Sequence, residues 1–583
     1  MSDHRDDSSA AGYGDPSQSH SGSSITRRQV LAGAGGTGLL AVAGPIGVLG
    51  SQPVPSPRAA GDGTPEQIHL TWGNDPTSSV TVSWASPSQA RGSRVLLLAP
   101  HGRGGPARVI PAFQRTYTDG INGETVFTYH AAITGLAPGT QYAYVVTADN
   151  DASAQPFEAT FSTAPLGRAP FRFTSFGDLA TPNTQWVLSY GQSAYAVAAV
   201  ESFKPLFHLL NGDLCYGDLN PASQPEVWQD FGNNNQTSAG NRIWMPCPGN
   251  HEVEFDNGPQ GFTSYLTRYT LPDNGLPPFR GRWYSFQVGS VLFISLDADD
   301  VVYQDAGAFV AGPSALTPVA STGNPAIEPG TSFYIHGYSG GVQTAWLERT
   351  LAAARRDPSV DWIIAQMHQI ACSSSVTGNG SDLGIRQEWL PLFDRYQVDL
   401  VLNGHDHDYE RSFPCRGFDS DVGTEVATGA PVQTLRPHPV TTADTGVFDT
   451  SKGTVHLVLG CGGTDANLDD YGVDAADGLP QAKVFTRANR PVLTSTPDVY
   501  ARPAADAVED AVWSARRDTS TGYGIAVFDV DPGTPDGMTS ITVTQYHALG
   551  ADPVNPATGE AGAPTPNYTE FETFTLVRPR SGR

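Results

Sequence analysis

Cysteine is scarce in this chain, with five residues among 583. A fold held together by disulfide bonds needs a far higher density, so that class of protein is excluded. The odd number leaves at least one thiol unpaired within the chain, and one or two bridges stay open because spacing does not fix connectivity. The length predicts about two or three folded units. A hydrophobic content of 39% with 10% aromatic residues is typical of globular domains.

Basic residues are also few. Lys and Arg number 34 against 59 Asp and Glu, which gives a formal net charge of −25. Such a surface repels nucleic-acid polymers and anionic membranes, so we expect neither as a partner. An acidic surface that keeps the protein solvated is the simplest interpretation of this charge.

Long hydrophobic runs are missing except near the N-terminus. Residues 29–50 carry no charge and follow Arg27 and Arg28, but glycine interrupts the run, unlike a stable membrane span. The pattern resembles a twin-arginine export signal, which predicts a leader over residues 1–61 and a secreted or cell-envelope protein exported by the twin-arginine machinery. We expect cleavage after Ala43 or in the stretch up to Ala60, with no membrane contact afterwards. An uncleaved N-terminal anchor is the alternative.

Residues 62–165 have the pattern of an antiparallel β-sandwich. Short alternating runs such as "VTVSWAS" and "QYAYVVTAD" are separated by Gly, Pro and Ser clusters. Roughly seven such strands in a stretch of this length are typical of a fibronectin type III-like domain. In "GLAPGTQYAYVV" we expect Tyr142 to be the corner tyrosine whose hydroxyl bonds to nearby backbone. This part holds no cluster of metal-ligating residues, so we interpret it as a scaffold or lid.

Residues 166–583 have an α/β pattern. Short apolar runs alternate with helical stretches such as "QSAYAVAAVESF" and "GVQTAWLERTLAAARR", which predicts βαβ units with strands buried on both faces. Residues 299–332 and 416–452 interrupt the pattern as loops that either wall the site or are surface insertions. Strand-like runs from about residue 520 are expected to close a second sheet.

Five of the apolar runs end in ionisable residues. The runs are "FRFTSFGD", "LFHLLNGD", "RIWMPCPGNHE", "DWIIAQMH" and "VDLVLNGHDH". In a sheet of this kind the ligand site lies beyond the carboxyl ends of the strands, so these residues are expected to meet there. The candidate metal ligands are Asp178, Asp213, Tyr216, Asn250, His368, His405 and His407.

The mixture of carboxylate, amide, phenol and imidazole suits a pair of first-row metal ions better than calcium. Asp213 can bridge two cations about 3.5–4 Å apart, as in two-metal hydrolases. On an extended segment the rings of His405 and His407 would point to the same side. Asp406 and Asp408 would then turn away, either to support the ligands from behind or into solvent.

The blocks "GDLA", "GDLCY", "GNHE", "AQMH" and "GHDH" resemble, in this order, those of the purple acid phosphatases within the metallophosphoesterase superfamily. The resemblance covers residues from about 66 to 580. It implies the sandwich followed by an αββα domain with two sheets flanked by helices. It further implies a ferric site made of Asp178, Asp213, Tyr216 and His407, and a divalent site for Zn, Mn or Fe made of Asp213, Asn250, His368 and His405.

The chain departs from this pattern at three places. Ala180 stands where the family usually has Gly, which concerns the turn after Asp178, and Ala365 replaces a Val, which concerns packing. The histidines that plant members carry after the fourth block to contact phosphate are absent. We therefore expect substrate contacts from elsewhere, with Arg386 as the candidate.

The function implied is that of a secreted phosphatase that hydrolyses phosphate monoesters, with a metal-held hydroxide attacking phosphorus. Asn250 and His251 would bind the phosphate, and His251 would protonate the leaving group. Alternatively His251 only orients Asp178 or a water, and Glu252 is expected to support the ligands. A phosphodiesterase or nucleotidase on the same centre is the second hypothesis, and a non-catalytic module that binds a partner through the sandwich is the third.

Overall fold

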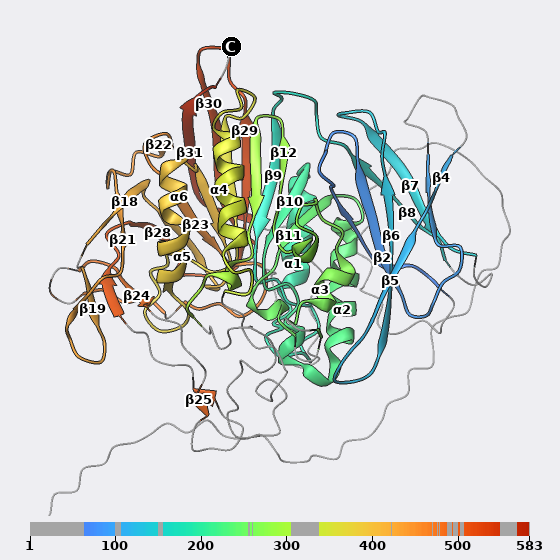
Figure 1. Ribbon diagram of the computed structural model, residues 1–583, viewed down its shortest axis with the longest axis horizontal. Helices are drawn as coiled ribbons and strands as arrows, with labels where there is room; N and C mark the ends of the chain where they lie inside the picture. Colours follow the sequence, from blue (N-terminus) through green and yellow to red (C-terminus); the bar gives the residue numbers. More distant parts are fainter. Residues whose placement is uncertain are drawn as a thin grey trace, which may run out of the picture. The chain divides into compact units, whose positions relative to one another are not determined.

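The structure is a computed structural model of the whole chain (Figure 1). It describes residues 63–98, 107–149, 155–254, 257–258, 261–304, 337–420, 422–468, 470–474, 476, 478–486, 492–493, 500–501, 507–548 and 568–581. The described residues all belong to the second of the two units into which the chain divides, residues 53–583. The expected leader over residues 1–61 and most of the loop 299–332 lie outside the described residues.

The N-terminal part of the second unit is the predicted β-sandwich. Its two sheets have the strand orders β1-β2-β6-β5 and β4-β3-β7-β8. The strands are β1 (Glu66–Thr71), β2 (Val80–Ser86), β3 (Arg94–Leu97), β4 (Arg108–Pro111), β5 (Phe113–Thr118), β6 (Thr125–Ile133), β7 (Gln141–Thr147) and β8 (Phe157–Ser162). Tyr142 is the expected corner residue, since its hydroxyl accepts a hydrogen bond from the Ala137 amide at 2.8 Å.

Two further sheets form the centre of the α/β part. The first has the order β22-β31-β30-β29-β9-β10-β11, and the second has the order β12-β13-β14-β16-β23-β17-β28. The first contains β9 (Phe171–Phe176), β10 (Phe207–Asn211), β11 (Ile243–Cys247), β22 (Val447–Asp449), β29 (Gly524–Asp531), β30 (Met538–Ala548) and β31 (Tyr568–Pro579). The second contains β12 (Tyr284–Val288), β13 (Val291–Ser295), β14 (Trp362–Gln366), β16 (Leu400–Asn403), β17 (Tyr409–Ser412), β23 (Val455–Leu459) and β28 (Ser514–Arg517).

Helices cover the outer face of each sheet, as Figure 1 shows, which confirms the predicted αββα arrangement. Side chains of α1 (Ser193–Phe203) and α2 (Gln224–Ala239) pack on the first sheet, and those of α4 (Val342–Ala354), α5 (Leu383–Glu388) and α6 (Leu390–Arg395) pack on the second. α3 (Thr263–Arg268) lies against β5 and β2.

Strand β14 illustrates why these runs are apolar throughout. Trp362 and Ile364 belong to the core between the sheets, while Ile363 and Ala365 pack toward the helices. Because successive side chains alternate, a strand with covered faces on both sides needs apolar residues at every position. Ala365, which departs from the family pattern, fills one of these packing positions.

The sandwich and the α/β part share one continuous sheet. β1 pairs in parallel with β11 at Leu70 and Ile243, which joins the sandwich sheet to β9-β10-β11 in an 11-stranded sheet. The hydrophobic core is also continuous, because Val82 and Tyr129 of the sandwich belong to the same cluster as Phe207 and Phe293. The sandwich is thereby fixed to the sheet that carries three of the ligand-bearing strands.

Two expectations about the later chain need revision. The stretch 416–452 is not an irregular loop, because it contributes β19 (Gly423–Glu425), β20 (Pro431–Val432), β21 (Arg436–Pro439) and β22, following β18 (Cys415–Asp419). The tail does not close a separate sheet, because β29 pairs with β9 and extends the first one. The remaining strands are β15 (Ser381–Asp382), β24 (Gln481–Phe485), β25 (Val492–Leu493), β26 (Tyr500–Ala501) and β27 (Ala507–Asp510).

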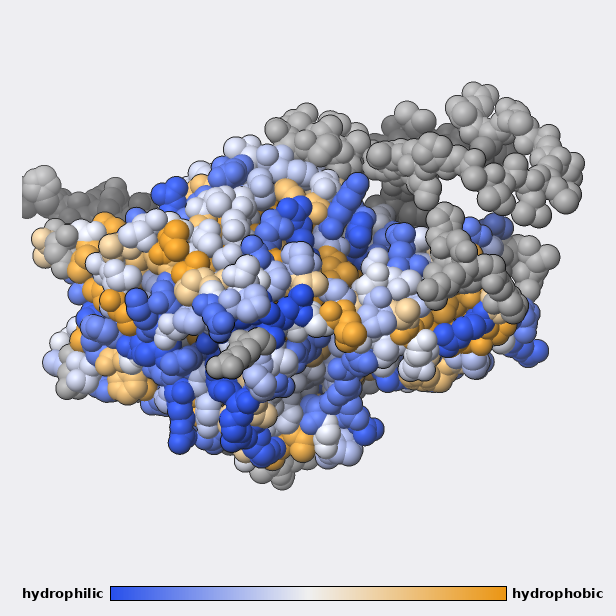
Figure 2. Space-filling view, turned by 90° about the horizontal axis from the view of Figure 1, so that it is seen from above, coloured by the Kyte–Doolittle hydropathy of each residue, from blue (hydrophilic) through white to orange (hydrophobic). Residues whose placement is uncertain are grey.

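All five cysteines are buried and unpaired, so neither of the bridges left open by the sequence forms. Among the described residues, no helix is both long and apolar enough to span a membrane. On the face drawn in Figure 2, hydrophilic residues cover most of the coloured surface and hydrophobic residues form small groups between them.

Candidate metal centre

The seven predicted ligands follow the carboxyl ends of five strands, three in one sheet and two in the other. Asp178 follows β9, and both Asp213 and Tyr216 follow β10. Asn250 follows β11 in the first sheet. In the second sheet His368 follows β14, and His405 and His407 follow β16. The parallel pairing within each sheet brings these ends to one edge, as the sequence predicts.

One group of ligands consists of Asp178, Tyr216 and His407. The Tyr216 hydroxyl lies 3.1 Å from Asp178 Oδ1 and 3.2 Å from His407 Nε2. His407 Nε2 is 3.4 Å from the same Asp178 oxygen. All three are buried, so three potential ligand atoms converge away from solvent.

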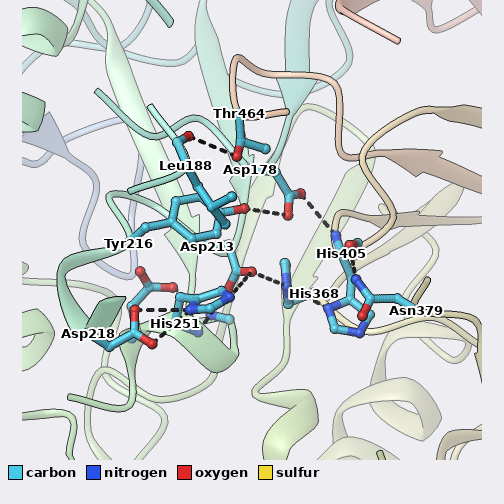
Figure 3. A network of polar contacts seen from close by, with 12 residues as sticks. Asp178, Leu188, Asp213, Tyr216, Asp218, His251, His368, Asn379, His405 and Thr464 are labelled. Carbon is cyan, nitrogen blue, oxygen red and sulfur yellow. Dashed lines mark hydrogen bonds and ion pairs between the residues drawn. The ribbon is translucent and has the colours of Figure 1, made fainter. Parts of the chain in front are cut away.

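The second group consists of Asp213, His368 and His405, whose ligand atoms lie within 4.8 Å of one another. His368 Nε2 is 2.9 Å from Asp213 Oδ2 and 3.2 Å from His405 Nδ1. Figure 3 shows the Asp213 carboxylate between the rings of His368 and His251. The two groups are adjacent, because Asp178 Oδ2 accepts a hydrogen bond from the His405 amide at 2.9 Å.

The donor set fits a pair of cations. Asn250 Oδ1 is buried and has no hydrogen-bond partner among the described residues, which is costly unless a cation binds it. Each histidine donates its outer ring nitrogen to an acceptor: His368 Nδ1 to Asn211 O at 2.8 Å, His405 Nε2 to Gln304 Oε1 at 2.9 Å and His407 Nδ1 to Asp465 Oδ1 at 2.6 Å. The inner nitrogen of each ring then presents its lone pair to the centre and can bind a metal ion, which is the usual arrangement of metal-bound histidine.

The backbone around the ligands is strained. Asp178, Asp213, Tyr216 and His405 all have positive φ angles, of 57°, 48°, 61° and 75°. Such angles are rare for residues with a side chain and cluster at functional sites. Four of the seven predicted ligands are therefore held in a backbone geometry that the chain adopts at a cost.

Glycine before a ligand allows close approach. A Cβ on Gly212 would lie 2.6 Å from His368 Nδ1, and a Cβ on Gly404 would overlap Asp178 and His368. Ala180, by contrast, keeps the left-handed angle of a glycine position, with φ of 57°. The turn is therefore retained at this departure from the family pattern, and Ala180 carries the strain that a glycine would avoid.

The segment carrying His405 and His407 is not extended. β16 ends at Asn403, and the positive φ of His405 directs its ring toward His368 while His407 turns to Tyr216. The expectation that both rings point to the same side because of strand alternation is wrong, although the two rings do serve separate groups. Asp406 and Asp408 are buried rather than solvated, and they accept hydrogen bonds from Ser373 and Tyr471.

Electrostatics in the centre favour a bound cation. Burial and the carboxylates of Asp178 and Asp213 raise the pKa of Tyr216 well above its usual value, so only a strongly charged cation would hold it as tyrosinate. Burial lowers the pKa of His368, but Asp213 and Asp178 outweigh it and raise the pKa to about 10. Protons thus occupy the positions where a cation would bind.

His251 lies beside both groups. Its Nδ1 donates to Asp218, 2.8 Å from Oδ2, and its Nε2 faces Asp213 Oδ2 at 3.8 Å. Its ring packs against that of Tyr216, with 4.5 Å between centroids. Asp218 thereby fixes the ring so that Nε2 points toward the centre.

Glu252 has the supporting role expected from the sequence. Its carboxylate accepts hydrogen bonds from the Leu214 amide at 2.9 Å and the Gly249 amide at 2.8 Å. These amides belong to the loops that carry Asp213 and Asn250, so Glu252 holds two ligand loops together.

Arg386 is not at the site, and its prediction as a substrate contact is wrong. Its side chain is fully buried, and its guanidinium donates to Ala371 O at 2.7 Å, Thr434 O at 2.9 Å and Glu509 Oε1 at 2.8 Å. All three guanidinium nitrogens are engaged inside the fold, so none is available for phosphate.

Three residues at the centre were not predicted from the sequence: Asp218, Gln304 and Asp465. Asp465 follows β23 in "VHLVLGCGGTD", another apolar run that ends in glycine and an aspartate. This pattern is similar to the one that identified Asp178 and Asp213, so Asp465 could have been predicted from the sequence. Gln304 lies nine residues beyond β13 with no such signal.

Known protein families define the class of protein. Residues 65–163 match the family model described as the purple acid phosphatase N-terminal domain, and residues 171–409 match the calcineurin-like phosphoesterase model. An uncharacterized protein of Mycobacterium tuberculosis strain H37Rv is 40% identical over 529 residues, which is 88% of this chain and 87% of that protein. Fold and site therefore define a metal-dependent phosphoester hydrolase with a binuclear metal centre.

Further relatives narrow the family. Human acid phosphatase type 7 is 26% identical over 445 residues, or 73% of this chain and 83% of that protein. The Fe(3+)-Zn(2+) purple acid phosphatase 12 of Arabidopsis thaliana is 25% identical over 356 residues, or 60% and 66%. The purple acid phosphatase PPD1 structure from yellow lupin has a TM-score of 0.56 at 17% identity over 89% of this chain and 75% of that one, which supports the fold. The chain belongs to the purple acid phosphatase family and is an acid phosphatase-type enzyme.

Proposed function

We propose that the enzyme is a secreted phosphatase for monoesters of small molecules, with Fe(III) in the Asp178–Tyr216–His407 group and a divalent Zn, Mn or Fe ion in the other. The observation that carries this proposal is the convergence of Tyr216, Asp178 and His407 within 3.4 Å, directly beside the Asp213–His368–His405 cluster. Asp213 is the candidate shared ligand, and the loop that carries Asn250 lies against it, because the amide of the next residue, His251, donates to Asp213 Oδ1 at 2.9 Å. A phenolate is a hard anionic donor, which suits a trivalent ion.

Bound in these groups, the two cations would neutralise the phosphate charge and supply an activated water as nucleophile. His251 then has two roles that its geometry supports. With Nδ1 held by Asp218, its Nε2 is directed into the centre, where it binds a phosphate oxygen and, as an imidazolium, protonates the leaving alcohol. Asn250 supports phosphate binding through its cation.

Substrate preference is tested by comparing an aryl phosphate with its bis-aryl diester on the fully metallated enzyme. We expect kcat/KM to be higher for the monoester, because a dianion makes full use of two cations and the His251 imidazolium. A higher value for the diester would instead support a phosphodiesterase. Turnover of neither ester after metal loading would support a non-catalytic binding module.

The export route belongs to the same proposal and rests on Arg27, Arg28 and the uncharged run that follows. Replacing both arginines with lysine in the full chain should leave the enzyme in the cytoplasm of an expressing cell, as measured by activity and immunoblot of cell fractions. An unchanged distribution would contradict export by the twin-arginine machinery.

A further inference from the structure

In the second sheet, the two strands that carry predicted metal ligands lie between two further parallel strands. Its four parallel strands have the order β13-β14-β16-β23, and the ligating histidines follow the two central ones. The chain beyond β13 brings in Gln304, and the chain beyond β23 brings in Asp465. These two residues contact the outer nitrogens of His405 and His407.

Asp465 is fixed behind His407. Its Oδ1 accepts from His407 Nδ1 at 2.6 Å and also from the Thr464 hydroxyl at 3.2 Å. Thr464 is in turn anchored, because its amide donates to Asp178 O at 3.1 Å and its hydroxyl lies 3.0 Å from Leu188 O, as Figure 3 shows. The carboxylate therefore has a defined position relative to the ligands Asp178 and His407.

Gln304 is fixed behind His405 by a different network, in which the side chains nearest the ring are amides. Its Nε2 donates to Asn379 Oδ1 at 2.8 Å, and Asn379 Nδ2 donates to the His405 carbonyl at 2.6 Å. The Gln304 amide donates to Asp382 Oδ2 at 2.8 Å, which holds the backbone in place. The side chain that meets the His405 ring is thus an oriented amide.

The two groups consequently differ in charge. His407 has a carboxylate behind it, and in front of it lie the Asp178 carboxylate and the Tyr216 phenol, which a bound trivalent ion would hold as phenolate. His405 has an amide behind it, and His368 has only the backbone carbonyl of Asn211. A carboxylate acceptor makes an imidazole more basic and adds a negative charge near the cation, which favours the ion of higher charge.

We propose that Asp465 and Gln304 are paired positioning residues that sort the two cations: Asp465, through His407, favours the trivalent ion in one group, and Gln304, through His405, retains a divalent ion in the other. This inference rests on the proposed function, since it assumes that two cations of unequal charge occupy the groups. It assigns no contact with substrate to either residue.

The test compares Asp465→Asn and Gln304→Leu in the full-length enzyme reconstituted with iron and zinc. For Asp465→Asn we expect iron affinity to fall about 10- to 100-fold, which is the usual effect of removing the hydrogen-bond partner of a metal-bound histidine. The tyrosinate-to-iron absorption band should move to longer wavelength, because a less basic His407 leaves the iron more electron-poor. For Gln304→Leu we expect a comparable loss of zinc affinity with the position of the band retained.

Two controls separate these effects from general damage. Asp465→Glu keeps the charge and should restore most of the iron content, while Glu158→Gln removes one charge from an exposed position of β8 and should change neither metal nor band. Wild-type metal content and band position in Asp465→Asn would overturn the inference. Absence of the band or of two metal ions in the wild-type enzyme would instead overturn the proposed function.

Discussion

The two ligand groups are equally buried but differ in chemistry. The Asp178 and Asp465 carboxylates and the Tyr216 phenol surround His407. In the other group Asn250, His368 and His405 are neutral donors, and Asp213 is the one carboxylate among the candidate ligands. The same edge of two sheets therefore provides two sites with different net charge. According to our proposal, the acceptor behind each histidine, supplied by the chain beyond a neighbouring strand, determines which ion each site favours.

Removing Asp213, the proposed shared ligand, should have the largest effect. Asp213→Ala deletes the carboxylate that lies 2.9 Å from His368 Nε2 and accepts a hydrogen bond from the His251 amide. Because Lewis-acid stabilisation by metal ions is worth several kcal/mol, we expect kcat to fall by about 10²- to 10⁴-fold. Metal analysis should show that both ions are reduced, and loss of only one would contradict a shared role.

The next effect concerns His251, which is adjacent to both groups. Changing His251 to Asn should lower kcat by about 10²- to 10⁴-fold with both metals retained, because the group that protonates the leaving alcohol is lost. Asp218→Asn should lower kcat less and should move the alkaline limb of the pH–kcat profile to lower pH, because an imidazolium that has lost its partner carboxylate gives up its proton more easily. An unchanged profile in Asp218→Asn would mean that the Asp218 contact does not set the acid strength of His251.

Chelation should separate the groups without mutation. A cation held by neutral donors loses less electrostatic energy on release than one held by a phenolate and carboxylates. A mild chelator is therefore expected to remove the divalent ion and the activity first, while the visible band persists. Parallel loss of band and activity, followed by absorbance and assay over time, would contradict the charge asymmetry.

The smallest effect is on stability at Ala180. The left-handed backbone costs about 1–2 kcal/mol in a residue with a side chain, and a glycine would avoid this cost. Glycine also loses more conformational entropy on folding, which cancels part of that gain. We expect Ala180→Gly to raise the free energy of unfolding by about 0.5–1 kcal/mol. The matched control Ala345→Gly, at an exposed position of α4, should lower it by about 0.5–1 kcal/mol, both measured by urea denaturation.

The sequence predicts most of the ligands because their signal is local. Each follows an apolar run, and parallel pairing brings the carboxyl ends of such strands together, so Asp178, Asp213 and His368 could be identified without the structure. Alternation of apolar runs with helical stretches predicts the α/β class, whereas the αββα arrangement and the role of Tyr142 were implied by resemblance to known domains. What it could not supply is the turn at His405, where a positive φ replaces the extended geometry assumed for His405 and His407.

Partners distant in sequence explain the remaining differences. Arg386 looked available for phosphate, yet it pairs with Glu509, which is 123 positions away. Gln304 and Asp465 lie 101 and 58 positions from the histidines they contact. Such contacts depend on strand order within the sheet, and the order β13-β14-β16-β23 is a tertiary property that periodicity does not encode.

The most direct test of the central claim is the visible absorption spectrum of the oxidised enzyme with metal analysis, compared with Tyr216→Phe. Tyr216 is buried between Asp178 and His407, so a ferric ion in that group should bind its phenolate and give a purple band. The account predicts this band in the wild-type enzyme and its loss in Tyr216→Phe. A colourless wild-type enzyme containing two zinc ions and no iron would contradict it.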